Sequence, residues 1–262
     1  MNILYFHQYF KTPSMSGGTR SYEMARRLAE AGDEVHVVTS WTDKSTSDKV
    51  FITNEEGVVV HWIPIYYSNK MRFNERIYAF IKYALMSIKV SIKIKSDLVI
   101  ATSTPLTIAI PGIIISKVKR IPMVFEVRDL WPELPIAMGV LRSPVAKYFA
   151  KLLERIAYKN SEVVIALSPG MKEGVIKTGY PSERVAVIPN SSDVQLFMKS
   201  NHVKTKLLNL LPEDPFILYA GTFGIINGVS YMVNLAGELN KIGSNVKIVL
   251  IGDGFEYDKI IK

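Results

Sequence analysis

Cysteine is absent from the 262 residues of this chain, which excludes disulfide bonds and thiolate catalysis and favours a reducing compartment. Long apolar runs are missing too, because none approaches the ~20 residues that a membrane-spanning helix needs. The opening MNILYF has no basic region and no cleavage site, so no secretory signal is expected. We therefore expect a cytoplasmic protein of one or two globular domains.

Acidic residues are outnumbered by basic ones, and the formal net charge is +8. This balance favours anionic partners, which include phosphates, acidic lipids and nucleic acid. No pattern typical of an RNA-recognition motif or a helix-turn-helix is present, so we do not expect nucleic acid to be the partner.

Short apolar runs alternate with amphipathic windows along most of the chain. Strands are predicted at residues 3–7, 35–39, 58–63, 98–102, 123–127, 163–167 and 185–188. Helices are predicted at residues 19–31, 74–95, 107–118, 143–160 and 170–178. Such alternation is typical of right-handed βαβ units, so the predicted fold class is α/β with mostly parallel sheets.

The pattern changes after residue 190. Residues 191–215 are polar and form the predicted crossover between a first domain, 1–190, and a second, 216–262. The second domain contains two predicted strands, 216–220 and 246–251, with a helix around 228–242 between them. Two strands do not make a stable open sheet, so we expect this domain to be incomplete.

Two adjacent glycines, Gly17 and Gly18, precede the first predicted helix. Backbone amides at a helix start lack internal partners and carry the positive end of the helix dipole, and glycine lets a phosphate approach them. The spacing is not that of the GxGxxG dinucleotide fingerprint. The alternative is that both glycines serve only a flexible loop.

A second cluster, VFEVRDLWPELP, begins in a predicted strand and ends in a stiff loop. Glu126, Arg128 and Asp129 are charged groups at the carboxyl end of that strand, where binding and proton transfer are favoured. Trp131 follows in the loop. The alternative is an Arg128–Asp129 ion pair that caps the strand, with Trp131 as a packing anchor.

Two further loops with glycines follow strands of the second domain. The segment YAGTFGIINGVS contains Gly221, Thr222, Gly224, Asn227 and Gly228, and VLIGDGFE contains Gly252, Asp253 and Gly254. Each loop alone is a weak signal. Four such strand ends in two α/β domains together favour a phosphate-bearing ligand.

Taken in order, these segments resemble the retaining family 4 glycosyltransferases of the GT-B fold. The resemblance is strongest to bacterial enzymes that transfer N-acetylated deoxyaminosugars in O-antigen and capsule synthesis. Two further segments of the chain also carry it, VVIALSPGMKE and VIPNSSDVQLF. It implies two Rossmann-like domains. It also implies transfer from a nucleotide-sugar, with UDP as the expected nucleotide, to an acceptor. The expected acceptor is linked to a polyprenyl diphosphate or is another glycan.

The resemblance also implies roles for individual residues. Catalytic roles fall on Asp129 and Arg128, and acceptor-side roles on Glu126, Trp131 and His7. Donor diphosphate contacts fall on Gly17, Gly18, Thr19, Thr222, Asn227 and Gly228. Contacts to the donor nucleotide fall on Gly221, Gly224, Gly252, Asp253 and Gly254. No metal and no cofactor are implied, because helix N-termini and basic side chains stabilise the leaving diphosphate.

The sequence departs from the family pattern in three places. Relatives commonly carry His where Arg128 or Asp129 stands. Many relatives carry Arg and Lys at the positions of Thr222 and Asn227, so backbone amides must hold more of the anion here. The family's acidic E-x7-E motif is expected beyond Lys262. A non-catalytic module that binds the acceptor or a membrane is therefore the alternative function.

The predicted helix 74–95 is basic and unusually apolar. Residues 70–95 carry seven basic side chains and one acidic one, Glu75. Lys82, Lys89 and Lys93 share one helix face. Such a helix suits the inner surface of the cytoplasmic membrane, where a peripheral protein would meet a lipid-linked acceptor. The alternative is a helix that packs on the sheet with a solvated lysine face.

Overall fold

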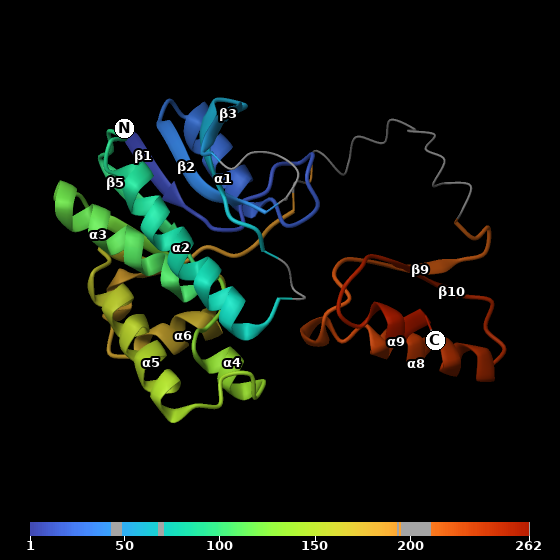
Figure 1. Ribbon diagram of the computed structural model, residues 1–262. Helices are drawn as coiled ribbons and strands as arrows, with labels where there is room; N and C mark the ends of the chain where they lie inside the picture. The colour runs from blue at the N-terminus through green and yellow to red at the C-terminus, as the bar shows by residue number, and fades with distance from the viewer. Residues whose placement is uncertain (43–48, 68–70, 193, 195–210, 262) are drawn as a thin grey trace. The chain divides into compact units, whose positions relative to one another are not determined.

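The chain forms two compact units, Met1–Ser191 and Ser192–Lys262, in the computed structural model (Figure 1). The structure describes residues 1–42, 49–67, 71–192, 194 and 211–261. Most of the predicted crossover 191–215 lies outside these residues, so the predicted domain boundaries stay a prediction.

The first unit is built on an eight-stranded sheet. Its strands are β1 (Asn2–Phe6), β2 (Glu34–Trp41), β3 (Phe51–Glu55), β4 (Val58–Pro64), β5 (Leu98–Thr102), β6 (Met123–Val127), β7 (Val163–Ala166) and β8 (Val185–Val187). Their order is β3-β4-β2-β1-β5-β6-β7-β8, and only β3 and β4 pair antiparallel. The predicted α/β class with a mostly parallel sheet is confirmed.

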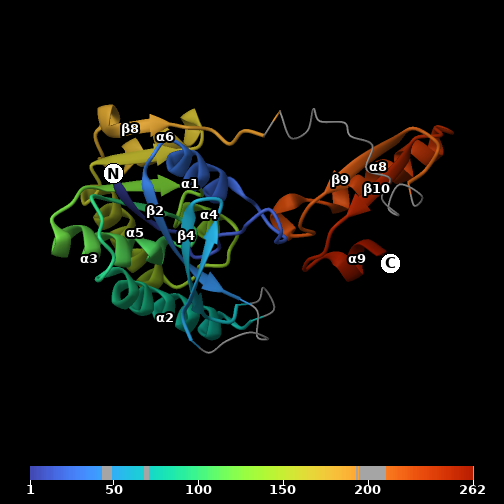
Figure 2. The same cartoon turned by 90° about the horizontal axis from the view of Figure 1, so that it is seen from above.

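Helices cover both faces of this sheet. They are α1 (Arg20–Glu30), α2 (Phe73–Ser91), α3 (Ala109–Lys119), α4 (Glu133–Ala137), α5 (Pro144–Lys159) and α6 (Pro169–Lys177), with short 3₁₀ turns at Leu106–Ile108 and Ser182–Arg184. Figure 1 shows α2, α3 and α5 in front of the sheet, and Figure 2 shows the same unit from above.

The alternation of side chains along β1 builds two separate cores. Leu4 and Phe6 are fully buried in one cluster, together with side chains of α2, α3, α5 and α6. Ile3 and Tyr5 point to the other face and pack in a second cluster with Tyr22 of α1. Each such side chain contributes about 1.5–3 kcal/mol through its burial. A sheet covered on both faces accounts for the continuous apolar runs of its strands.

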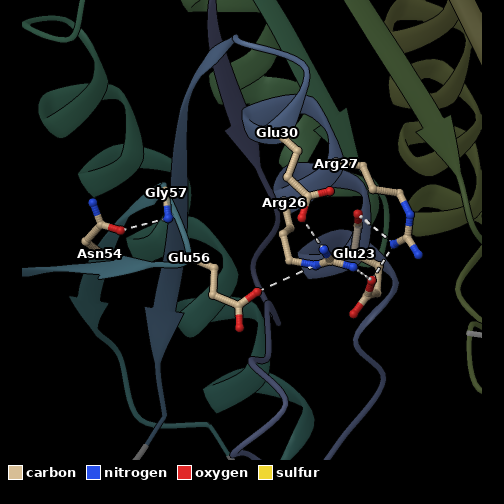
Figure 3. A network of polar contacts seen from close by, with 7 residues as sticks. All are labelled: Glu23, Arg26, Arg27, Glu30, Asn54, Glu56 and Gly57. Carbon is tan, nitrogen blue, oxygen red and sulfur yellow. Dashed lines mark hydrogen bonds and ion pairs between the residues drawn. The ribbon is translucent and has the colours of Figure 1, made fainter. Parts of the chain in front are cut away.

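Ion pairs hold the exposed side of α1 and join it to the β3–β4 turn (Figure 3). Arg26 pairs with Glu23 and Glu30 on α1, and its Nε lies 3.7 Å from Glu56 in the turn. Exposed pairs of this kind contribute about 0.2–1 kcal/mol each. Gly32 follows the helix with φ of 95°, a left-handed conformation that glycine adopts readily at a helix end.

The sequence interpretation missed β3 and α4. β3 is an edge strand whose side chains alternate between exposed and half-buried, so it lacks the apolar run of the inner strands. Its turn to β4 needs positive φ at Glu56 and Gly57, of 51° and 87°. α4 has only five residues, and helices that short give no periodic signal. The predicted helix 74–95 is also too long, because α2 ends at Ser91.

The second unit contains β9 (Phe216–Ala220) and β10 (Lys247–Ile251), which pair parallel. Between and after them lie a 3₁₀ turn (Ile225–Asn227), α8 (Ser230–Lys241) and α9 (Tyr257–Ile261). The predicted strand–helix–strand order is thus confirmed for the described residues. No helix of the described chain is both long and apolar enough to cross a membrane.

Gly112 allows α3 to pack closely on the sheet. An alanine Cβ at this position would lie 2.9 Å from Met123 Sδ and 3.0 Å from Ala101 Cβ. We predict that Gly112→Ala lowers the free energy of unfolding by about 1–3 kcal/mol through overpacking. Chemical denaturation measures this change. The control is Gly170→Ala in α6, where no atom lies within 4 Å of the new Cβ. Equal effects of the two substitutions would show that α3 packs less closely than described.

Candidate functional site

A pocket of about 440 Å³ lies in the first unit, beyond the carboxyl ends of β1, β5, β6, β7 and β8. It is lined by His7, Tyr9, Lys11, Gly17, Gly18, Thr104, Arg128, Asp129, Leu167 and Asn190. These residues come from loops that are up to 183 positions apart in the sequence, from His7 to Asn190. In parallel α/β sheets this edge is where ligands bind. The structure therefore brings the glycine pair and the Arg128–Asp129 loop into one pocket.

The glycine pair lines the pocket with backbone rather than side chains. Gly17 adopts φ of 138°, which other residues rarely adopt. Gly18 has ordinary φ, and a Cβ there would meet only Arg128 Nη2, at 4.0 Å. The fold of the first unit thus does not itself require glycine at position 18. The amides of Gly17, Gly18 and Thr19 donate to no described residue, so they are free to bind an anion.

Arg128 and His7 contact each other on one side of the pocket. Arg128 Nη1 donates to His7 Nε2 over 3.2 Å. Because a guanidinium can only donate, His7 must accept at Nε2 and carry its proton at Nδ1. Burial, with a smaller effect of the Arg128 charge, lowers the pKa of His7 to about 3. The histidine is therefore neutral at physiological pH, and the positive charge of this pair belongs to Arg128.

Asp129 is oriented by a hydroxyl from a neighbouring strand end. Thr104 Oγ1 donates to Asp129 Oδ2 over 2.8 Å, and both residues line the pocket. Among the described ion pairs, none joins Asp129 to Arg128. The alternative interpretation of these two residues as a mutual ion pair is therefore not supported. A carboxylate fixed in this way can accept a proton or a hydrogen bond from a ligand hydroxyl.

Sequence reasoning missed several lining residues, among them Tyr9, Lys11, Thr104 and Asn190. Tyr9 and Lys11 lie in the loop after β1, as Arg128 and Asp129 lie in the loop after β6, and that shared position was the available signal. Burial lowers the pKa of Lys11, whose stem lies against Gly17. Lys11 adds a second cation to the wall that holds the free amides.

Beneath the pocket, Arg20 connects three separate segments. Its guanidinium lies 2.7 Å from Glu126 Oε1, and it donates 3.0 Å hydrogen bonds to the carbonyls of Ile188 and Pro189. The Glu126 side chain is fully buried. Thr102 Oγ1 lies 3.0 Å from Glu126 Oε2. Since a carboxylate only accepts, Thr102 donates to it. The helix start, the end of β6 and the last segment of the first unit are thus held together.

Three of the predicted site residues of the first unit do not line the pocket. Glu126 lies under it and is occupied by Arg20, so it is not exposed to an acceptor. Trp131 is half-buried and packs against the larger core cluster, as the alternative interpretation expected. Thr19 is the N-cap residue of α1, but its side chain makes no capping hydrogen bond.

In the second unit, the two predicted loops pack on each other. Gly221 N donates to Ile251 O, and Phe223 N donates to Asp253 O, over 2.9 and 3.0 Å. A Cβ at Gly252 would overlap Gly221 O, and one at Gly254 would lie 2.6 Å from Phe223 O. The fold of this unit therefore needs glycine at both positions.

The remaining predicted residues of the second unit surround its 3₁₀ turn. Gly228 adopts φ of 60°, and Thr222 O accepts from the Tyr219 hydroxyl over 3.0 Å. A Cβ at Gly224 would lie 2.9 Å from Asn227 Oδ1. No group of three or more potential metal-ligating side chains is found in the described chain.

A family assignment comes from the sequence. The model of the family described as Glycosyltransferase Family 4 matches residues 17–196. This range begins at the glycine pair and ends just beyond the last residue of the pocket. No curated protein sequence matches the chain.

Solved structures show the fold. Sucrose-phosphate synthase from Thermosynechococcus elongatus is similar with a TM-score of 0.66 and 17% identity, over 95% of this chain and 61% of its own. HepE of Anabaena, in complex with UDP and glucose, is similar with a TM-score of 0.63 and 19% identity, over 100% of this chain and 64% of its own. A UDP-N-acetylglucosamine 2-epimerase is similar with a TM-score of 0.56 and 12% identity, over 95% of this chain and 62% of its own. The chain spans about three fifths of these structures. The predicted GT-B type of α/β fold is confirmed.

The neutral, buried His7 predicts a specific pH dependence of stability. The unfolded state takes up a proton near the ordinary histidine pKa of about 6.5, whereas the folded state does so only near pH 3. The contribution of neutral His7 to the free energy of unfolding is therefore fully present above about pH 6.5. It falls as the pH drops from there toward about 3, by about 1.4 kcal/mol per pH unit. We predict that His7→Gln reduces this slope between about pH 6.5 and 5.

His61 provides a parallel case outside the pocket, because burial lowers its pKa to about 4. His61→Gln should reduce the slope similarly, and the double variant should reduce it twice as much. Denaturant titrations across this pH range measure the slopes. An unchanged slope in His7→Gln would mean that His7 is protonated in the folded protein.

The buried Arg20–Glu126 pair predicts a large loss of stability on truncation. Arg20→Ala leaves the Glu126 carboxylate without its cation, which costs about 3–5 kcal/mol. Adding Glu126→Gln to that variant should recover part of the loss, because the buried charge is removed. The control on the same helix is Arg27→Ala, whose exposed pair with Glu23 contributes at most about 1 kcal/mol. Similar losses for Arg20→Ala and Arg27→Ala would contradict a role for burial.

Proposed function

Because this chain belongs to glycosyltransferase family 4, we propose that it transfers a sugar from a nucleotide-sugar to a hydroxyl of an acceptor, with retention of configuration. The observation that carries this proposal is the pocket at the sheet edge. It combines free amides, two cations and one oriented carboxylate in a single space. These are the groups that a departing diphosphate and an incoming hydroxyl require.

The leaving diphosphate would bind at the side of the pocket with the glycine pair. There the amides of Gly17 and Gly18 and the charges of Lys11 and Arg128 face one space. The negative charge that develops on the leaving group is stabilised by donors that are already oriented, so little reorganisation is needed. The absence of a side chain at Gly18 leaves room for a phosphate next to Arg128.

Asp129 is proposed as the group that orients or deprotonates the acceptor hydroxyl. Thr104 holds its carboxylate at the pocket wall. His7 is neutral and accepts from Arg128, so its proposed role is to position the guanidinium. We propose that Trp131 and Glu126 support the acceptor side from behind the pocket wall.

A UDP-linked N-acetylated deoxyaminosugar is our proposed donor. HepE of Anabaena is described in complex with UDP and glucose, which is consistent with a UDP donor in a chain of the same fold. The motif pattern of the sequence, with Thr222 and Asn227 in the second domain, supports the deoxyaminosugar. The proposed donor contacts of the second domain are Thr222, Asn227, Gly221, Gly224, Gly228, Gly252, Asp253 and Gly254. Thr19 is a further proposed donor contact, in the first domain.

The proposed acceptor is a glycan or sugar on a polyprenyl diphosphate, used in O-antigen or capsule synthesis at the inner face of the cytoplasmic membrane. The basic residues of α2 support this location. Lys82 and Lys89 are exposed, and Glu75 is the only acidic residue of that helix. We expect neither a metal ion nor a cofactor to take part.

The alternative function is a module that binds the acceptor or a membrane without transferring sugar, and the exposed bases of α2 support it. The 262-residue chain itself separates the two functions. We expect it to bind UDP-sugars in calorimetry and to transfer radiolabelled sugar to a polyprenyl-diphosphate acceptor. A folded chain with neither property would favour the binding module over the transferase for these 262 residues.

Asp129 and Gly18 give the mutational prediction for transfer. Asp129→Asn should lower kcat by about 10²–10⁴-fold, because proton transfer is lost while Thr104 keeps its contact. Gly18→Val should raise the KM of the donor more than that of the acceptor, because its side chain occupies the space for a phosphate. Initial-rate kinetics measure both changes.

The control for Gly18→Val is Gly170→Val, which also adds a side chain at an open position, in α6. Thermal melts should show both variants folded, since no atom lies closer than 4.0 Å to a Cβ at position 18. Wild-type rates in Asp129→Asn and Gly18→Val would remove both assignments.

A further inference from the structure

An exposed apolar stripe runs along α5, which the sequence interpretation did not connect with any function. Val145, Tyr148, Phe149, Leu152 and Ile156 lie at helical spacing on one side of this helix, and Tyr148 and Phe149 are 65% and 61% exposed. Their rings contact edge to face with centroids 5.6 Å apart. The opposite side of the helix is buried in the core. Large apolar side chains gathered on one exposed face indicate an interaction surface.

Two neighbouring helices extend this stripe into a surface. α3 contacts both α2 and α5, and all three helices pack on the same face of the sheet. Their sides away from the sheet therefore point in a common direction. Exposed apolar side chains on the neighbours are Ile77, Tyr78, Ile81 and Leu85 of α2 and Ile114 and Val118 of α3. We call these residues and the α5 stripe the α2/α3/α5 surface.

The charges on these helices are almost all positive. Exposed bases are Lys82 and Lys89 of α2, Lys117 of α3, and Lys151, Arg155 and Lys159 of α5. Two acids belong to the three helices, Glu75 and Glu154. Glu154 is buried, which raises its pKa to about 7. Glu75 is therefore the one exposed acid of the described α2, α3 and α5.

We infer that the α2/α3/α5 surface docks on an anionic lipid bilayer, with α5 as its main anchor. A bilayer surface offers negative headgroups to the bases and an acyl boundary to the apolar side chains. Tyr and Phe suit that boundary because they are apolar bodies that tolerate the interface. A protein partner would need an apolar face rimmed only by acids to match the same pattern.

The inference rests on the membrane location in the proposed function and narrows it to one surface. α2 and α5 each follow a strand in a parallel βαβ unit, so their N-terminal ends lie at the sheet edge that carries the pocket. Tyr78 and Ile81 lie in the N-terminal half of α2, and Tyr148 and Phe149 in that of α5. A docked bilayer would therefore meet the protein beside the pocket.

Vesicle flotation tests the inference with lipid alone. Vesicles of phosphatidylcholine, with or without phosphatidylglycerol, contain neither donor nor acceptor, so a failure of sugar transfer cannot affect the result. We expect the wild-type chain to bind only the anionic vesicles, and high salt to weaken this binding. Lys151→Gln/Arg155→Gln should weaken it at least about tenfold. Tyr148→Gln/Phe149→Gln should abolish it.

The matched control is Ile52→Gln/Lys177→Gln, which removes one exposed apolar and one exposed basic side chain from β3 and α6. It should bind like the wild type, and circular dichroism melts should show every variant folded. Absence of wild-type binding to anionic vesicles would overturn the inference, as would equal binding by the α5 variants. A concentration-dependent oligomer that the α5 variants dissolve, without vesicle binding, would instead assign the surface to a second copy of the chain.

Discussion

The ion pair between Arg20 and Glu126 is the interaction on which the pocket depends. Arg20 is the first residue of α1, directly after the loop with the glycine pair, and Glu126 is the second-last residue of β6. The pair therefore fixes the loop with the free amides relative to the strand that presents Arg128 and Asp129. A buried carboxylate is costly unless it is paired and hydrogen-bonded, and Glu126 meets both conditions through Arg20 and Thr102.

The same arrangement separates positive charge from proton chemistry. Arg128 supplies the positive charge, and its hydrogen bond to His7 occupies the acceptor nitrogen of the histidine. His7 therefore orients Arg128, while its single proton stays on Nδ1. Asp129 is left as the carboxylate that lines the pocket, and Thr104 holds it by a hydrogen bond. An anionic leaving group and a reacting hydroxyl would thus meet different residues of one wall.

Sequence alone predicted the inner strands, the helix that follows the glycine pair and the convergence of two loops on one edge of the sheet. These follow from periodicity and from the geometry of parallel sheets. The burial of Glu126 could not be predicted, because its partner Arg20 is 106 positions away and no local pattern connects them. Lys11 and Tyr9 escaped notice for a similar reason. Their importance comes from the pocket they share with residues far along the chain.

The exposed face of α5 shows a further limit of pattern reading. Its apolar residues 145, 148, 149, 152 and 156 have the spacing expected of a helix side that packs on a sheet. In the fold, a different side of α5 packs inward, through Ala157 and Tyr158, so the helix carries two apolar sides. Burial in the core can account for only one of them. The exposed bases Lys151 and Arg155 accompany the other side, and this charge supports the inferred docking of that side on an anionic surface.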